Sequence, residues 1–240
     1  MLIDSATSAV FDRIAQRAAD AKMAFTPGAA PTRGDVATEK PESHFALDPL
    51  SVAAPENAYF ITTDGRGRRC YTRDGSFALH DATLVGSNGK PMLGFVTQNG
   101  PLVQLRVDSV DEALGRARML RVEADGTVAY DRAAVDPRSG GQETQRVVVG
   151  QLALARFAAG TKLVTVDANH LAAPPDEPPH IGRPADENFG TLTAFAREDS
   201  RVDLDASLQK LKDAYLAFDA LQAAHKAKGH LGKTAMDLLK

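Results

Sequence analysis

The sequence predicts an α+β protein that is mainly β: an antiparallel β domain flanked by N- and C-terminal helices that form a separate helical bundle region. Three observations carry this prediction. Apolar residues recur at helical spacing at both ends of the chain, Asp-Gly and Asn-Gly dipeptides separate short apolar runs in the middle, and a proline-rich stretch divides the first end from the middle. The length of 240 residues allows one large domain or two small ones.

Residues 2–24 are predicted to form the first helix, because apolar side chains recur there every three or four positions. The helix is expected to end before Thr26-Pro27-Gly28, since proline disfavours helical geometry in the residue ahead of it. Its apolar stripe is expected to contact a partner. The stripe residues assigned to that interface are Ile3, Val10 and Ile14.

Residues 26–57 contain five prolines and predict an extended connector with little regular structure. A structureless connector of this length is rare inside a compact domain. The first helix is therefore expected to pack away from the β domain or against another chain. The expected division is 1–57 for the N-terminal helix and connector, 58–200 for the β domain and 201–240 for the C-terminal helix.

From residue 58 onward, short runs rich in β-branched and aromatic residues predict strands. Five dipeptides that accept the positive φ angles of two-residue hairpin turns lie among them. These are Asp64-Gly65, Asp74-Gly75, Asn88-Gly89, Asn99-Gly100 and Asp125-Gly126. Residues 108–118 are expected to hold one helical turn or a loop, the proline-rich centre of 163–190 a stiff surface loop, and 191–199 one last strand.

Residues 203–228 are predicted to form the second helix, with Asp203 as its N-cap and Gly229 as its stop. Its apolar positions alternate spacings of four and three, as in a heptad seam. The seam residues assigned to an assembly interface are Leu204, Leu208, Leu211, Tyr215 and Phe218. The stripes leave two arrangements open: the two helices pair within one chain and cap the β domain, or they pack with helices of neighbouring subunits.

Composition and motifs predict no catalytic, cofactor or metal site. The net charge is −3 and the pI about 6.1, so no nucleic-acid-binding surface is expected. The chain has one cysteine, no tryptophan, no apolar run long enough to span a membrane and no secretory signal peptide. No histidine pair has ligand spacing, and neither a phosphate-binding glycine loop nor a G-x-S-x-G elbow is present. An active site assembled from distant strands stays open as an alternative.

The segment CYTRDGSFALHDATLVGSNGKPMLG resembles the hallmark hairpin of bacterial flagellar rod and hook proteins. Its residues that match the first part of the family motif are Tyr71, Thr72, Arg73, Asp74, Gly75, Ser76 and Phe77. The matching residues of the later part are Leu84, Val85, Gly89, Pro91, Leu93 and Gly94. Because these residues match in the same order over the whole hairpin, the resemblance is specific.

Three further pieces follow in the order of the family, so the resemblance extends over roughly residues 58–230. LRVEADGTVAYD is similar to its I-x-I-x-x-D-G-x-V strand pair, and VVVGQLALARF to its V-G-Q-L-x-L-x-x-F segment. Gly190, Leu192, Ser200 and Val202 match the closing segment, and Tyr215 lies near the aromatic residue of the family's last helix.

The chain also departs from the family at both helices. After the first helix the family has an N-N-L-A-N-x-x-T-x-G-F motif, of which only Thr26, Pro27 and Gly28 are present. Arg201 and Asp203 replace the asparagines that flank the shared valine. These segments belong to the axial core of the family, so the chain is expected to be a divergent rod subunit or a paralogue at a special axial position.

The resemblance implies a structural subunit of the flagellar basal-body rod, of the proximal- or distal-rod type, without enzymatic activity or cofactor. Its implied partners are other rod and hook-type axial proteins, copies of itself and the flagellar export apparatus, with the rod in the periplasm and no cleaved signal peptide. Two alternatives remain: a hook-type or adaptor member of the same superfamily, and a soluble enzyme or ligand-binding module built on a β domain.

Overall fold

The computed structural model describes residues 2–25, 28–29, 42–113, 115, 119–135, 141–167, 169–200 and 204–237. The chain divides into two compact units. The helical unit contains the two long helices α1 (Leu2–Met23) and α3 (Leu204–Asp237). The β unit contains the strands, together with Gly28 and Ala29.

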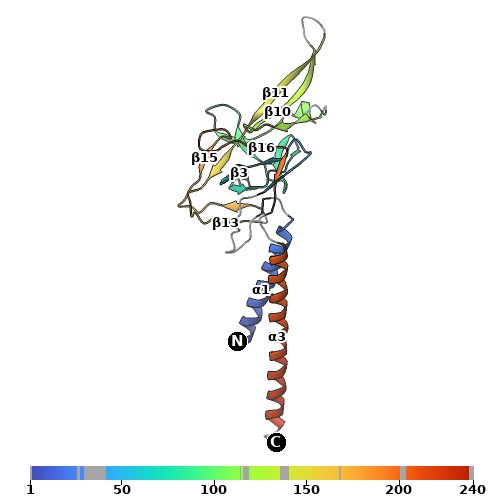
Figure 1. The fold of residues 1–240 in the computed structure, drawn as a ribbon, viewed down its shortest axis with the longest axis vertical. Helices are drawn as coiled ribbons and strands as arrows, with labels where there is room; N and C mark the ends of the chain where they lie inside the picture. Colours follow the sequence, from blue (N-terminus) through green and yellow to red (C-terminus); the bar gives the residue numbers. More distant parts are fainter. Residues whose placement is uncertain are drawn as a thin grey trace. The chain divides into compact units, whose positions relative to one another are not determined.

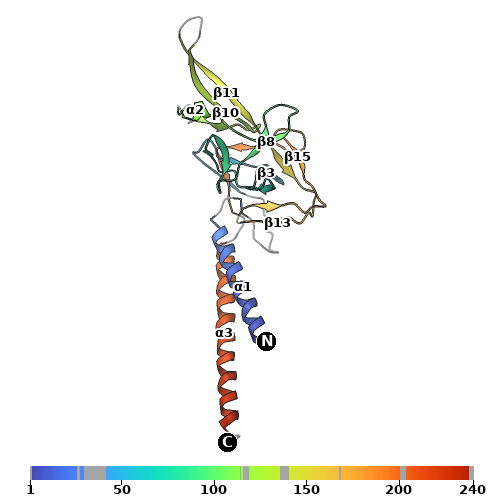
Figure 2. The same ribbon diagram turned by 180° about the vertical axis from the view of Figure 1, so that it is seen from behind.

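The two helices lie side by side and run in opposite directions (Figures 1 and 2). The predicted first helix is confirmed to within one residue. The second helix begins as predicted but does not stop at Gly229, because it continues to Asp237. A single glycine inside a helix costs only about 1 kcal/mol relative to alanine, which is too little to end a helix that neighbouring residues support. The proposed N-cap Asp203 lies outside the described residues.

The prediction of a separate helical bundle region is wrong. The described residues contain two long helices, one N-terminal and one C-terminal, and the rest of the described structure is mainly antiparallel β. Two helices form a pair with one shared face, whereas a bundle closes a core between three or more helices. The periodicity identified an apolar stripe on each helix, but it did not reveal how many helices share the stripe.

Two antiparallel sheets form most of the β unit. The six-stranded sheet has the order β13 (Val164–Thr165), β14 (Leu171–Ala172), β4 (Arg69–Thr72), β3 (Ala58–Thr63), β12 (Leu154–Arg156) and β15 (His180–Gly182). The five-stranded sheet has the order β8 (Leu102–Gln104), β7 (Leu93–Phe95), β11 (Gln142–Leu152), β10 (Thr127–Val135) and β9 (Arg121–Val122).

Three two-stranded pairings complete the unit. They join β1 (Ser43–Phe45) to β17 (Ala196–Glu198), β2 (Val52–Ala53) to β16 (Thr193–Ala194), and β5 (Phe77–His80) to β6 (Thr83–Gly86). The predicted strand runs between residues 58 and 157 are confirmed, and the helical alternative for 108–118 is confirmed by the short helix α2 (Ser109–Ala113).

The proline-rich segments hold more strands than their composition predicted. β1 and β2 lie within the predicted connector, β13, β14 and β15 lie within or beside the predicted loop, and the last predicted strand is divided into β16 and β17. Each of these strands is only two or three residues long. Several of their partners are distant in sequence, as in the pairing of Ser43 with Glu198, and strands this short carry little periodicity of their own.

The glycine-containing turns have three-residue loops, so the predicted two-residue turns are wrong. Gly67, Gly89 and Gly126 each have φ between 76° and 80° and occupy the last loop position. Each donates its N–H to the carbonyl three residues earlier, and the flanking residues close the hairpin, as in the Asp64 N–H to Arg68 O bond of 2.9 Å. This is the type I turn with a glycine bulge, which is the usual three-residue hairpin loop.

The opening hairpin of the family motif uses a different turn. β5 and β6 are joined at Asp81 and Ala82, which have φ of 46° and 58°. An alanine in the left-handed region is uncommon, so this turn could not be predicted from the residue types at Asp81 and Ala82. Gly75 does not form a turn between paired strands, since β4 and β5 belong to different sheets.

The main apolar core lies between the two large sheets. Phe60 and Leu154 come from the six-stranded sheet, Tyr130 and Leu152 from the five-stranded sheet, and Leu84 from β6. A second cluster on the other face of β3 includes Ile61 and Tyr71. Successive residues of a strand point to opposite faces, so a strand covered on both sides is buried at nearly every position, as AYFITT is.

Candidate functional site

Seven of the eight residues assigned to an assembly interface have described side chains, and these differ in burial within the helical unit. Ile14 is buried, and Val10, Leu204, Leu211 and Phe218 are half-buried. Leu208 and Tyr215 are 46% and 52% exposed. The side chain of Ile3 lies outside the described part of the structure. The single seam read from the sequence is therefore two seams.

The inner seam of α3 belongs to the helix pair. Its residues alternate spacings of three and four, and all are buried or half-buried: Leu204, Ser207, Leu211, Ala214, Phe218 and Leu221. Phe218 packs on Phe11 of α1, with ring centroids 4.7 Å apart. Small side chains at Ser207 and Ala214 allow two helices to approach closely. Neither position belongs to the interface that was assigned from the sequence.

A second stripe on α3, here called the outer stripe, is formed by Leu208, Tyr215 and Leu216. Leu216 is 58% exposed, so all three residues leave about half of their surface in contact with solvent. Beside Phe11 and Phe218 the helix pair also has a groove of about 380 Å³, which His225 and Lys226 close on one side. Large apolar side chains that remain exposed along one helix face are typical of an interaction surface.

The residues of the family hairpin motif have structural roles inside the β unit. Tyr71, Thr72, Arg73, Asp74 and Gly75 are all buried, as is Phe77. Tyr71 packs edge-on against Phe157, with ring centroids 5.0 Å apart, and burial raises the pKa of its hydroxyl. Cys70, beside this motif, is also buried, and burial raises the pKa of its thiol. The matched motif is thus part of the core and its border.

Arg73 forms a buried ion pair with Glu198, and the two side chains are only 4% and 2% exposed. Arg73 Nε donates to the two carboxylate oxygens at 2.7 and 2.8 Å, and Nη2 donates to the same carboxylate. Nη1 donates to the carbonyls of Ala58 and Pro55, and Nη2 also donates to that of Ala54. A guanidinium has five N–H donors, and these contacts use its full capacity.

The backbone around this ion pair is closely packed. A Cβ atom on Gly75 would lie 1.7 Å from the carbonyl oxygen of Val52. One on Gly28, which has φ of 65°, would lie 2.6 Å from the backbone of Arg73 and Asp74, and the Gly28 N–H donates to the carbonyl of Glu198. The segment that follows α1 and the segment that leads to α3 therefore meet at Arg73 within the β unit.

A third buried charge lies in the five-stranded sheet. The Tyr130 hydroxyl donates to Asp111 of α2 at 2.5 Å, and Arg132 donates to the same carboxylate at 3.1 Å. Burial, together with this hydrogen bond, raises the pKa of Tyr130 to about 12. The positive charge of Arg132 compensates the negative charge of Asp111, and the two contacts join α2 to β10. This contact could not be predicted from the sequence, because Asp111 and Tyr130 lie 19 positions apart and no motif connects them.

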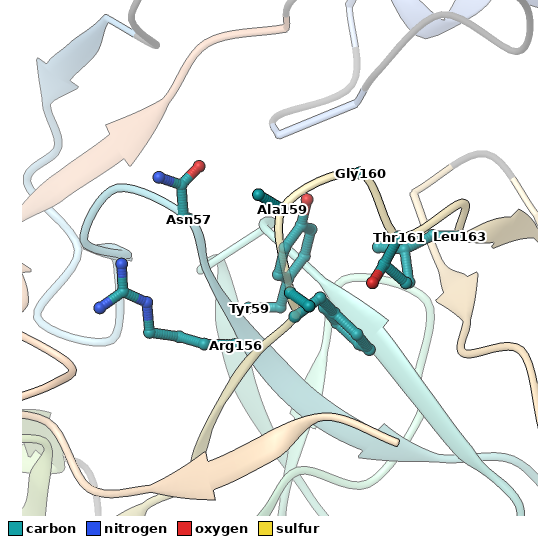
Figure 3. A pocket seen from close by; sticks show the side chains of 9 residues that line it. Asn57, Tyr59, Arg156, Ala159, Gly160, Thr161 and Leu163 are labelled. Carbon is teal, nitrogen blue, oxygen red and sulfur yellow. The ribbon is translucent and has the colours of Figure 1, made fainter. Parts of the chain in front are cut away.

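The β unit also has a surface cavity of about 400 Å³ (Figure 3). Tyr59 and Phe157 form its aromatic wall, with ring centroids 5.6 Å apart, and the loop from Ala158 to Thr161 forms its rim. Arg156 is the one charged residue that lines it, and its guanidinium donates to the carbonyl of Asn188. Among the described residues, its lining contains no carboxylate, histidine or cysteine.

The described part of the chain contains no group of three or more side chains placed to hold a metal ion. None of its helices combines the length and the apolar character needed to cross a membrane. No protein-family model matches the chain, and no curated protein matches it.

Proposed function

We propose that this chain is a structural subunit of the bacterial flagellar basal-body rod, which assembles through its terminal helices into the axial drive shaft. The observation that carries the proposal is the outer stripe of Leu208, Tyr215 and Leu216, which stays exposed after α3 has paired with α1. Burying one large apolar side chain contributes about 1.5–3 kcal/mol, so such a stripe favours association with another subunit.

The family-like hairpin supports the same proposal from the other unit. The charged side chains of its first part, Arg73 and Asp74, are buried and bound to groups of this chain, so neither is available to a substrate. In a scaffold protein such residues hold the strands in register. The proposed partners are other rod and hook-type proteins, copies of this chain, and the export apparatus that would deliver it to the periplasmic rod.

The experiment that tests the proposal is deletion of the gene, followed by a swimming assay and electron microscopy of isolated basal bodies. Loss of swimming together with missing or truncated rods is the expected result, and expression of the intact chain is expected to restore both. Normal swimming with complete rods would refute the structural role. Intact rods that carry no hook would favour the hook-type or adaptor alternative.

A further inference from the structure

His170 is buried in the β unit with one ring nitrogen unsatisfied. Its side chain is 1% exposed. Nδ1 lies 2.8 Å from Oδ1 of Asp167 and 2.8 Å from Oδ1 of Asn169, both of which are acceptors. Nδ1 also lies 2.9 Å from Nδ2 of Asn88, an amide donor, so its three neighbours are two acceptors and one donor. Nε2 is enclosed and has no hydrogen-bond partner among the described residues.

The orientation of the Asn169 amide is fixed independently of the histidine. Its Nδ2 donates to Oδ2 of Asp74 at 2.9 Å and to the hydroxyl of Ser87 at 3.1 Å, so its oxygen must face the imidazole. The Ser87 hydroxyl donates to the same oxygen of Asp74. The Asn169 oxygen and the Asp167 carboxylate are thus two acceptors beside Nδ1, against the single donor of Asn88, and this favours the Nδ1–H tautomer.

The charged groups around His170 are Asp167, Lys90 and Asp74. Lys90 forms an ion pair with Asp167, so the one carboxylate that contacts the imidazole is already shared with a cation. A proton on Nε2 would place a second positive charge in a buried position without an acceptor. Burial lowers the pKa of His170, the charge of Lys90 acts in the same direction, and Asp167 only partly opposes them.

This polar cluster holds a hairpin at the edge of the six-stranded sheet. His170 closes the turn between β13 and β14 by accepting the Val166 N–H at 2.8 Å. Among the described residues, the ladder contact of β14 with β4 is the single pair Leu171 and Tyr71. Further attachment comes from side chains, including the ion pair of Lys90 with Asp167 and the hydrogen bond of 2.9 Å from Nδ2 of Asn169 to Asp74.

We propose that His170 is an acid-sensitive latch: protonation of Nε2 releases the β13–β14 hairpin and leaves the edge of β4 at Tyr71 free to pair with another strand. In the open state the histidine is solvated and has an ordinary pKa near 6.5. The closed state therefore loses no stability above that pH. It loses stability progressively as the pH falls from about 6.5 towards the lower pKa of the closed state, because only the open state takes up the proton in that interval.

Hydrogen exchange of the hairpin amides, corrected for intrinsic rates, tests the latch between pH 7.5 and 4.5. The opening equilibrium of residues 163–172 is expected to rise by up to about tenfold per pH unit within the interval and to level off below it. His170→Gln is expected to remove this pH dependence. His180→Gln, which changes an exposed histidine at the opposite edge of the same sheet, is expected to behave like the unchanged protein.

A second measurement on the unchanged protein keeps the test decisive if the variant does not fold. In an NMR titration, the Cε1 proton of His170 is expected to titrate below the ordinary histidine pKa of about 6.5. A His170 titration at or above that value would overturn the proposal. Protection of the hairpin that is independent of pH in the unchanged protein, or that is equally dependent in His170→Gln, would overturn it as well.

Discussion

The two units use apolar and charged residues in opposite ways. In the β unit, even charged groups are buried and fully paired, as Arg73 and Glu198 are. In the helical unit, large apolar groups remain exposed on α3 after the helices have paired, as Leu208 and Tyr215 do. The buried ion pair of the β unit is compensated within it, whereas the outer stripe of α3 is a surface that another molecule can bury. Substitutions in the two units should therefore affect different properties.

The largest effect on stability is expected from Glu198→Gln. The change removes the negative charge but keeps the shape, so the cation of Arg73 stays buried without compensation. Breaking a buried ion pair by changing one partner costs about 3–5 kcal/mol. Urea unfolding of the purified chain measures this loss, and Glu187→Gln, at an exposed site, provides the matched control with a change within about 0.5 kcal/mol.

The double variant Arg73→Met with Glu198→Leu sharpens this test. Removing both charges relieves the unpaired ion, but the carbonyls of Pro55 and Ala58 lose their donors. Partial recovery relative to Glu198→Gln is therefore expected. A single variant as stable as the unchanged protein would show that the pair does not hold the β unit together.

The second largest effect is expected from Ile14→Ala, which acts on the helical unit. Ile14 is 9% exposed, and truncating a buried isoleucine to alanine costs about 2–5 kcal/mol. Circular dichroism at 222 nm during thermal unfolding should show the helices melting earlier. Ala15→Ser, at an exposed position of the same helix, is the control. An unchanged helical transition would mean that α1 does not depend on its buried face.

A smaller effect is expected from Gly75→Ala. The added methyl would meet the carbonyl oxygen of Val52 at 1.7 Å, so the backbone must shift. Overpacking of this kind costs about 1–3 kcal/mol. Gly65→Ala is the matched control, because no atom lies within 4 Å of its added Cβ. Equal stability of the two variants in urea would contradict the close approach at Gly75.

These variants also show where reasoning from the sequence succeeded. The strand AYFITT and the first helix could be predicted because their periodicity is local. The pairing of Arg73 with Glu198 could not be predicted, because 125 positions separate them. Nothing in the sequence around either residue distinguishes a buried charge from an exposed one. Gly75 was assigned to a turn, since an Asp-Gly dipeptide looks the same whether glycine supplies a positive φ or merely lacks a Cβ.

The same limit applies to the candidate site, which could be predicted from the sequence only in part. A stripe at three- and four-residue spacing marks which residues of a helix are apolar, but neighbouring positions such as Ser207 and Leu208 can belong to an inner and an outer seam. Only the packing of the helix pair separates them. The resemblance located the motif from Tyr71 to Phe77, and the structure buries all of these residues except Ser76. Glu198 and Phe157 are partners that the motif did not contain.

The smallest effect on stability, and the largest difference between stability and function, is expected from Leu208→Glu combined with Tyr215→Glu. Both residues are about half exposed, and glutamate is a good helix former, so the unfolding free energy of the isolated chain should change by no more than about 0.5 kcal/mol. In a deletion strain, however, the double variant should fail to restore swimming, because two charges would have to be buried against the next subunit. Gln209→Glu with Gln222→Glu adds the same charge at exposed polar positions of α3 and should restore it. Restored swimming by both double variants would show that the outer stripe stays in solvent during function. The contrast between the two units would then concern stability alone.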